Sequence, residues 1–123
     1  MLGKFRSYQL AVQFYKECEK VRGARHLQDQ LIRAAASIAL NLAEGSQRVT
    51  DADQRRFYRM AMGSTRECQA ILDLINPSPQ SKAASELGNS VAASVFGICK
   101  YLDRKLATNG NSEQRTENSE PES

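Results

Sequence analysis

The sequence is poor in the residues that build metal and catalytic centres. It has no Trp, a single histidine, His26, and three cysteines in 123 residues. A zinc site takes about four Cys or His ligands, and a di-iron bundle takes Glu-x-x-His pairs, so neither centre is expected. A Gly-rich phosphate loop is also missing, because Gly45-Ser46 follows a predicted helix instead of preceding one. Since no Ser/His/Asp set can be built either, we expect no catalytic residues, no metal, no cofactor and no enzymatic activity.

The cysteines indicate a reducing compartment, and the lack of long apolar runs argues against a membrane span. Cys18, Cys68 and Cys99 are widely spaced and include no C-x-x-C pair. They lie on or beside apolar faces of three predicted helices, where a thiol is usually a small core side chain. No run of about 18 apolar residues occurs, and we see no secretory signal, so no membrane span is expected. We therefore expect a soluble, cytoplasmic protein.

Neither sign of charge dominates the whole chain. The 17 Lys and Arg residues face 14 Asp and Glu residues, which gives a formal charge of +3. This small value hides an asymmetry, because residues 1–106 carry +6 and residues 107–123 carry −3. The last segment has no large apolar side chain, so we predict a disordered acidic and polar tail over residues 107–123.

Apolar residues recur at intervals of three and four between the Gly and Pro positions, which predicts an all-α protein. We expect helices over about residues 4–22, 26–44, 50–76 and 81–106. The third opens at Thr50, with Asp53 in an approximate capping box. Short connections favour an antiparallel, up-down-up-down four-helix bundle over residues 1–106.

Two predicted helices carry more apolar surface than an isolated bundle buries. The helix over 26–44 adds Ile32, Leu40 and several alanines beside its core face, although the alanines alone can reflect helix propensity. Beyond its core seam, the next helix adds Tyr58, Met60, Met62, Ala70, Leu72 and Leu74. Such extra faces predict a protein partner, most economically a second copy of the chain in a homo-oligomer.

The polar side chains of the second helix form a narrow stripe that ends at Glu44. A carboxylate is disfavoured at a helix C-terminus, so we expect a cationic partner for it, which Arg33, Arg48 or Arg66 could supply. We predict a polar network, buried or at an interface, made of Arg33, Ser37, Asn41, Glu44, Arg66 and Glu67. Direct ligand contact is the alternative, and a small ligand-binding bundle would need a pocket around this stripe.

A distinctive run occupies this helix, Arg33-Ala34-x-x-Ser37-Ile38-x-x-Asn41-Leu42-Ala43-Glu44-Gly45, and it is followed by Arg48, Phe57, Met60-Ala61, Gly63-Ser64 and Glu67. Together these residues resemble the four-helix-bundle proteins encoded in intervening sequences of bacterial 23S ribosomal RNA genes. That family is related to the accessory variability determinant proteins of diversity-generating retroelements. The resemblance covers about residues 5–75 clearly. The family often has Pro after Ser-Ile, where this chain has Ala39, so the kink that Pro would cause is not expected.

The resemblance implies a bacterial protein that forms a ring-shaped homo-oligomer, most simply a homopentamer. The accessory relatives bind nucleic acid and a reverse transcriptase through a basic surface. RNA or DNA, and a protein partner such as a reverse transcriptase, are therefore the partners that the resemblance implies.

In an antiparallel bundle the cationic residues fall into two clusters. Candidate nucleic-acid-binding residues at one pole are Lys4, Arg6, Lys100, Arg104 and Lys105, and those at the other are Lys16, Lys20, Arg22 and Arg25. A ring repeats each cluster, which favours multivalent binding of RNA or DNA backbone. Within a single protomer, the alternative is that these cations only keep the protein soluble. The alternative function is a protein-interaction scaffold or accessory subunit that binds no nucleic acid.

Overall fold

The chain folds as four α-helices in a computed structural model, which describes the backbone of residues 2–119 and the side chains of residues 3–108. The helices are α1 (Leu2–Cys18), α2 (Arg25–Ser46), α3 (Asp51–Leu74) and α4 (Pro79–Ser119). No strand occurs within residues 2–119, so the predicted all-α class is confirmed. None of the helices in this range is long and apolar enough to cross a membrane.

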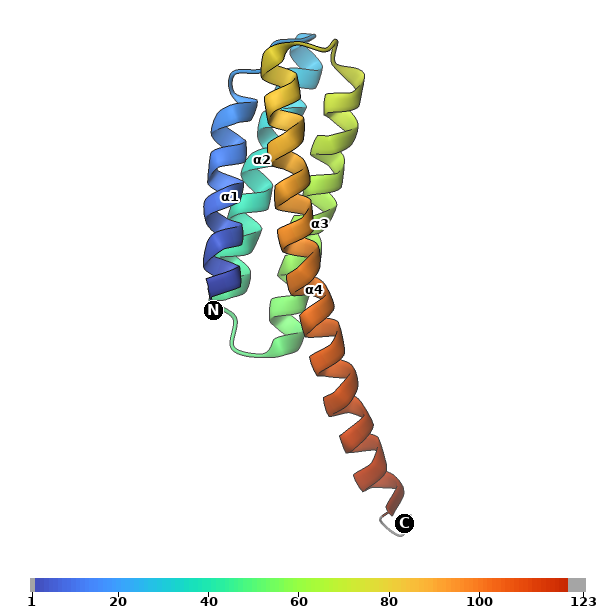
Figure 1. Ribbon diagram of the computed structural model, residues 1–123. Coiled ribbons are helices and arrows are strands. Elements are labelled where there is room, and N and C mark those ends of the chain that lie inside the picture. Colours follow the sequence, from blue (N-terminus) through green and yellow to red (C-terminus); the bar gives the residue numbers. More distant parts are fainter. Residues whose placement is uncertain (1, 120–123) are drawn as a thin grey trace.

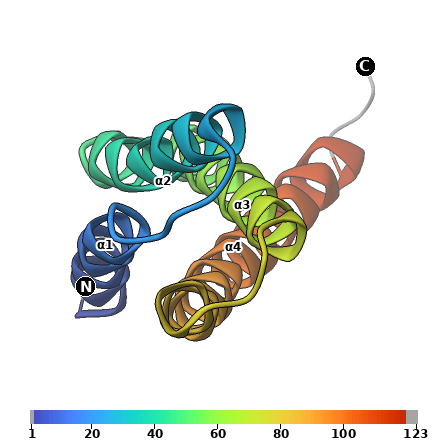
Figure 2. The ribbon, with the colours of Figure 1, turned by 90° about the horizontal axis from the view of Figure 1, so that it is seen from above.

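Each helix packs against two others. α1 and α3 both contact α2 and α4, so the helices follow one another around the core in chain order (Figure 2). The α1–α2 and α3–α4 connections lie at one end, and the N-terminus and the α2–α3 connection lie at the other (Figure 1). The end that holds the N-terminus and the α2–α3 connection is called the N-terminal pole below. It includes the start of α1, the region around residues 46–59 and α4 near residue 103. The other end is called the opposite pole.

A single core of buried side chains joins the four helices. Its largest fully buried members are Phe14, Val21, Leu31, Ile38, Leu42, Tyr58, Val91, Val95 and Leu102. Burying one large aliphatic or aromatic side chain contributes about 1.5–3 kcal/mol, so burial of this set strongly favours folding. Tyr8 shares the helical spacing of the apolar residues Ala11, Tyr15 and Cys18, which predicts a place in the core, but it is 40% exposed.

Side-chain caps explain where α3 and α4 begin. The Thr50 hydroxyl accepts a hydrogen bond from the Asp53 backbone N–H at 3.1 Å, which confirms the predicted cap of α3. α4 starts at Pro79, slightly before the predicted Ser81, because proline suits the first helical position. Ser78 and Ser81 cap each other, since the hydroxyl of each accepts from the backbone N–H of the other at 3.0 and 2.8 Å.

α1 ends at Cys18, whereas the apolar pattern predicted a helix to about residue 22. The N–H groups of Lys20 and Val21 bond to carbonyls three residues earlier, so the helix tightens and stops there. The chain then turns inward to bury Val21, whose carbonyl accepts a hydrogen bond from the Gln28 side chain at 3.0 Å.

α4 runs on to Ser119, past the predicted end of the last helix near residue 106. No proline interrupts residues 80–119, so nothing in the backbone removes a helical hydrogen bond there. The side chains from 109 onward and the whole of residues 120–123 lie outside the described residues. The disorder expected of residues 107–123 stays a prediction.

Two apolar residues of α3 that were expected outside the core lie within it. Tyr58 is fully buried and Leu72 is nearly so, because α3 packs against α2 on one side and α4 on the other and therefore buries a wider arc. The expectation was wrong for these two. It holds for Leu40 on α2 and Leu74 on α3, which are 69% and 68% exposed.

The three thiols are core side chains. Cys18, Cys68 and Cys99 are all buried, as their positions on apolar faces predicted. Burial raises the pKa of each thiol, to about 12 for Cys68. Since the thiolate is the reactive form, none of them is available as a nucleophile near neutral pH.

α2 and α3 approach each other closely beside Gly45. A Cβ atom at this position would lie 3.1 Å from the Phe57 Cβ and 3.4 Å from the Tyr58 Cε2. The Phe57 Cβ is fixed by its own backbone, so it cannot move aside without shifting α3. Farther along the same pair of helices, the Ser37 and Ser64 hydroxyls form a hydrogen bond at 2.9 Å. Small side chains therefore set the α2–α3 spacing.

We expect Gly45→Ala to be less stable than the matched variant Gly97→Ala. A Cβ at Gly97, inside α4, meets no atom within 4 Å, so that change should stabilise the fold by about 0.5–1 kcal/mol through lower unfolded-chain entropy. The crowding at Gly45 should cancel that gain or reverse it. Urea unfolding followed by circular dichroism measures both, and equal stabilisation by the two changes would contradict the close approach.

We also expect all three cysteines to resist a thiol-specific reagent in the native state. Burial and the raised thiol pKa values should make labelling at mildly alkaline pH far slower than labelling of the same chain in denaturant. Mass spectrometry counts the labelled thiols at each time. Rapid labelling of the native protein would show that at least one thiol is accessible.

Candidate nucleic-acid interface

The N-terminal pole brings together cations from separate parts of the chain. Lys105 of α4 pairs with Asp51 at the start of α3 at 3.3 Å. The Lys4 ammonium of α1 donates to Gln54 of α3 at 2.6 Å. These contacts place the start of α1, the start of α3 and the region of α4 around Lys105 at one level. The structure thus gathers the first predicted cluster, Lys4, Arg6, Lys100, Arg104 and Lys105, at one end of the molecule.

Arginines of α3 add to this cluster. Asp103 of α4 accepts from Arg55 at 3.3 Å and from Arg59 at 2.9 Å, so two guanidinium groups share one carboxylate. Arg56 pairs with Asp53 at 3.6 Å. All of these side chains are partly or largely exposed, so each pair contributes about 1 kcal/mol or less to stability.

The pattern of the sequence did not single out these arginines, because four Arg and four acids cancel over residues 49–76. The feature that could have identified them is their position along the predicted helices. Arg55, Arg56 and Arg59 fall in the first turns of α3, at the N-terminal pole, and Arg48 lies in the α2–α3 connection. Summing the charges at each end of the predicted bundle, instead of along consecutive residues, would have identified these arginines.

Four cations of the N-terminal pole have no acidic partner among the described side chains, namely Lys4, Arg6, Lys100 and Arg104. Partial burial lowers the pKa of Lys4 below its usual 10.5, and nearby Lys105 lowers it further while Asp51 opposes the change. The Lys4 ammonium is thus a cation in a partly desolvated place, where an anion is attracted more strongly than in open water.

The opposite pole holds the second predicted cluster, Lys16, Lys20, Arg22 and Arg25. The first three of these line one shallow surface depression together with Glu19 and Gln80. Lys20 pairs with Glu17 at 3.5 Å, and Arg25 approaches Asp29 at 3.9 Å. This cluster is gathered as predicted, but neighbouring acids neutralise much of its charge.

Two guanidinium groups cover an aromatic ring at the N-terminal pole. Arg48 and Arg56 lie 4.7 and 4.5 Å from the centroid of the Phe57 ring. Arg48 also forms an ion pair with Glu44, which makes it the partner of Glu44 among the three that the sequence suggested. The cation–π contacts hold both arginines near the surface of α3.

The predicted polar network is split in the structure. Asn41 donates to the Ser37 hydroxyl at 3.0 Å, and that hydroxyl bonds to Ser64. Arg66 bonds to Gln69 instead, at 3.3 Å. Arg33 and Glu67 are exposed, and no hydrogen bond joins either to this group among the described side chains. The six residues therefore do not form one network within the chain, and their place in an interface between copies stays a prediction.

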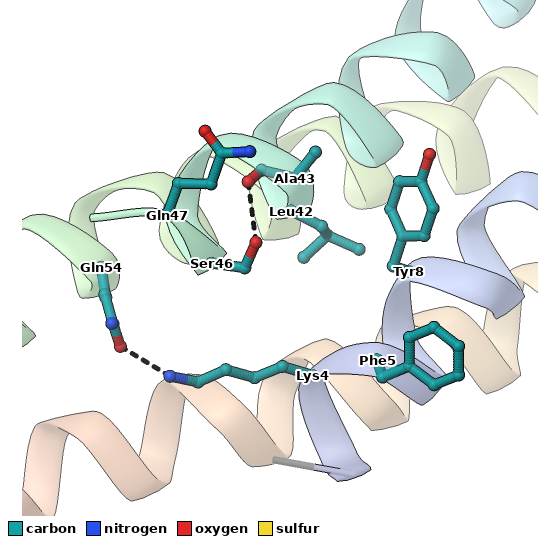
Figure 3. Close-up of a pocket in the computed structure, with 8 residues that line it drawn as sticks. All are labelled: Lys4, Phe5, Tyr8, Leu42, Ala43, Ser46, Gln47 and Gln54. Carbon is teal, nitrogen blue, oxygen red and sulfur yellow. Dashed lines mark hydrogen bonds between the residues drawn. The ribbon is translucent and has the colours of Figure 1, made fainter. Parts of the chain in front are cut away.

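A pocket of about 530 Å³ opens between α1 and α2 at the N-terminal pole (Figure 3). Its apolar wall consists of Phe5, Tyr8, Leu42 and Ala43, and its polar wall of Lys4, Ser46, Gln47 and Gln54. Helical spacing predicts a core position for Tyr8, and the pocket is lined by residues from three separate parts of the chain, so the periodicity of the sequence gives no sign of it.

Comparison with known proteins identifies the family. A family model described as 23S rRNA-intervening sequence protein matches residues 4–87. A crystal structure of a protein of unknown function from the S23 ribosomal protein family of Bacteroides thetaiotaomicron VPI-5482 has a similar fold, with a TM-score of 0.65 and 21% sequence identity over 80% of this chain and 98% of that chain. A search of curated proteins finds no match. The four-helix fold and the matched residues together place this chain in the 23S rRNA-intervening sequence protein family.

Proposed function

We propose that this protein is a non-enzymatic homo-oligomer whose N-terminal pole binds the phosphate backbone of RNA or DNA. The observation that carries the proposal is the surplus of cations at this pole. Nine cations, Lys4, Arg6, Arg48, Arg55, Arg56, Arg59, Lys100, Arg104 and Lys105, lie there with four acids, Glu44, Asp51, Asp53 and Asp103. Such a concentration of one sign raises the local positive potential and attracts polyanions.

The oligomer in this proposal is a ring, most simply a homopentamer, built from antiparallel, up-down-up-down bundles. A closed ring needs two different contact surfaces on each protomer. Large exposed apolar side chains on more than one helix, such as Leu40 on α2 and Leu74 on α3, support this requirement. With the helices along the ring axis, cyclic symmetry places every N-terminal pole on one face, and the repeated cations bind a long polyanion multivalently.

A protein-interaction scaffold or accessory subunit without nucleic acid is the second candidate. Leu74, which is 68% exposed and lies near the opposite pole, favours this candidate, because an exposed apolar side chain far from the proposed nucleic-acid surface suits a protein partner. A reverse transcriptase is one such partner. Pull-downs after nuclease treatment separate the two candidates, since only a scaffold keeps its partner.

Removing three cations from the N-terminal pole should weaken nucleic-acid binding more than removing three from the opposite pole. The first variant carries Lys100→Gln, Arg104→Gln and Lys105→Gln, and its matched control carries Lys16→Gln, Lys20→Gln and Arg22→Gln. We expect a loss of at least about tenfold for the first and less than about threefold for the second. The slope of log affinity against log salt should also fall by about two for the first variant.

Fluorescence anisotropy with a labelled oligonucleotide over a series of salt concentrations measures both quantities, and circular dichroism confirms folding. Equal losses in the two variants would mean that charge acts without regard to position. Unchanged affinity in the first variant would remove the N-terminal pole as the binding surface.

Leu40→Gln should reduce the oligomer to smaller species at micromolar concentration. Leu40 is mostly exposed within the protomer, so the change should affect assembly and leave helix content unchanged. The matched control is Val49→Gln, at another exposed apolar side chain, in the α2–α3 connection. Light scattering gives the masses. A monomeric wild-type protein would contradict the ring, and an unchanged mass for Leu40→Gln would remove α2 from the interface.

A further inference from the structure

We infer that the pocket between α1 and α2 takes an unpaired nucleobase, so the nucleic acid bound at the N-terminal pole is single-stranded. This inference rests on the proposed function and specifies its ligand. The pocket volume of about 530 Å³ lies within the usual range of small-molecule sites, about 300–1,000 Å³. Its walls separate into an apolar part and a polar part, which matches a base with two apolar faces and a polar edge.

Phe5 and Tyr8 supply the apolar contact. They stand on successive turns of α1 at the end of the pocket away from Gln54 (Figure 3). They are 61% and 40% exposed, and they line the pocket together with Leu42 and Ala43. An aromatic ring with a free face is a platform on which any base can stack.

The polar wall offers groups for the edge of a base. The Ser46 hydroxyl donates to the Ala43 carbonyl at 2.8 Å, so its lone pairs stay available as acceptors (Figure 3). Gln47 is exposed and presents an amide that both donates and accepts. Gln54 is held from two sides, because its amide nitrogen donates to the Arg48 carbonyl at 2.9 Å and its oxygen accepts from Lys4.

Lys4 connects the pocket to the surrounding cations. Its ammonium lies at the polar end of the pocket and donates one of its three N–H groups to Gln54 (Figure 3). Lys4 also lines a second groove, between α1 and α4, together with Tyr101. A phosphate next to a base in the pocket would therefore meet Lys4, and the strand could continue toward α4.

α4 repeats the combination of aromatic ring and cation. The Lys100 ammonium lies 5.5 Å from the centroid of the Phe96 ring, and the Lys105 ammonium lies 5.8 Å from that of Tyr101. Both rings are about half exposed. Exposed aromatic rings interleaved with cations are typical of single-strand binding, whereas the bases of a duplex are stacked on one another and cannot reach such rings. A nucleotide strand fits this surface better than a neutral apolar ligand because Lys4, which has no acidic partner among the described side chains, lines both the pocket and the groove toward α4.

The test compares Tyr8→Ala and Phe5→Ala with Tyr8→Phe, which keeps the ring, and with Val49→Ala, which removes another exposed apolar side chain near the same pole. Affinity is measured for a single-stranded oligonucleotide and for a duplex of the same length. We expect each of the two pocket variants to lose about fivefold to hundredfold in single-strand affinity, with the salt slope and duplex affinity unchanged. Tyr8→Phe and Val49→Ala should bind as the wild-type protein does.

A fluorescent adenine analogue that stacking quenches provides a second readout. Its emission should fall on binding to the wild-type protein and fall less on binding to Tyr8→Ala. Equal losses for single strand and duplex would overturn the base pocket while leaving backbone binding in place. The pocket variants could instead change the oligomer mass without a selective loss of single-strand affinity. That result would show that another copy of the chain fills the pocket, and it would also overturn the inference. No binding of any nucleic acid by the wild-type protein would overturn the proposed function itself.

Discussion

The close approach of α2 and α3 at Gly45 is the constraint on which the N-terminal pole depends. Because no side chain intervenes, Phe57 and Tyr58 of α3 pack directly against α2. The Phe57 ring then supports the guanidinium groups of Arg48 and Arg56. The Tyr58 ring lies under the Lys4 ammonium, 5.6 Å from its centroid, so the start of α1 is tied to the same point. A wider spacing between the two helices would move all of these cations.

The N-terminal pole gathers more cations than its acids neutralise. Two arginines share Asp103, and partial burial lowers the pKa of Lys4, with Asp51 opposing this change and Lys105 adding to it. An excess of one sign of charge attracts a ligand of the opposite sign. The phosphate backbone of a nucleic acid would supply that opposite charge.

Much of the fold could be predicted from the sequence because it follows from local rules. Helical periodicity predicted four helices, and the Thr50 hydroxyl caps α3 where the capping pattern placed it. Periodicity failed for the burial of Tyr58, which depends on two neighbouring helices at once, and for the end of α1, which stops at Cys18 although Val21 beyond it is buried. The pocket could not be predicted, since the free faces of Phe5 and Tyr8 depend on the distance between α1 and α2. Charges summed along the chain concealed Arg55, Arg56 and Arg59, although the fold joins Arg55 and Arg59 to Asp103 of α4 at the N-terminal pole.

In the proposed complex, one end of a four-helix protein is the binding surface, with cations for the backbone and aromatic rings for unpaired bases. Photo-crosslinking of a single-stranded RNA that carries thiouridine, followed by mass spectrometry of the linked peptides, tests this most directly. We predict crosslinks in the peptides that contain residues 4–8, 46–56 and 96–105. Crosslinks confined to residues 16–25 at the opposite pole, or none at all, would show that single-stranded RNA does not bind at the N-terminal pole.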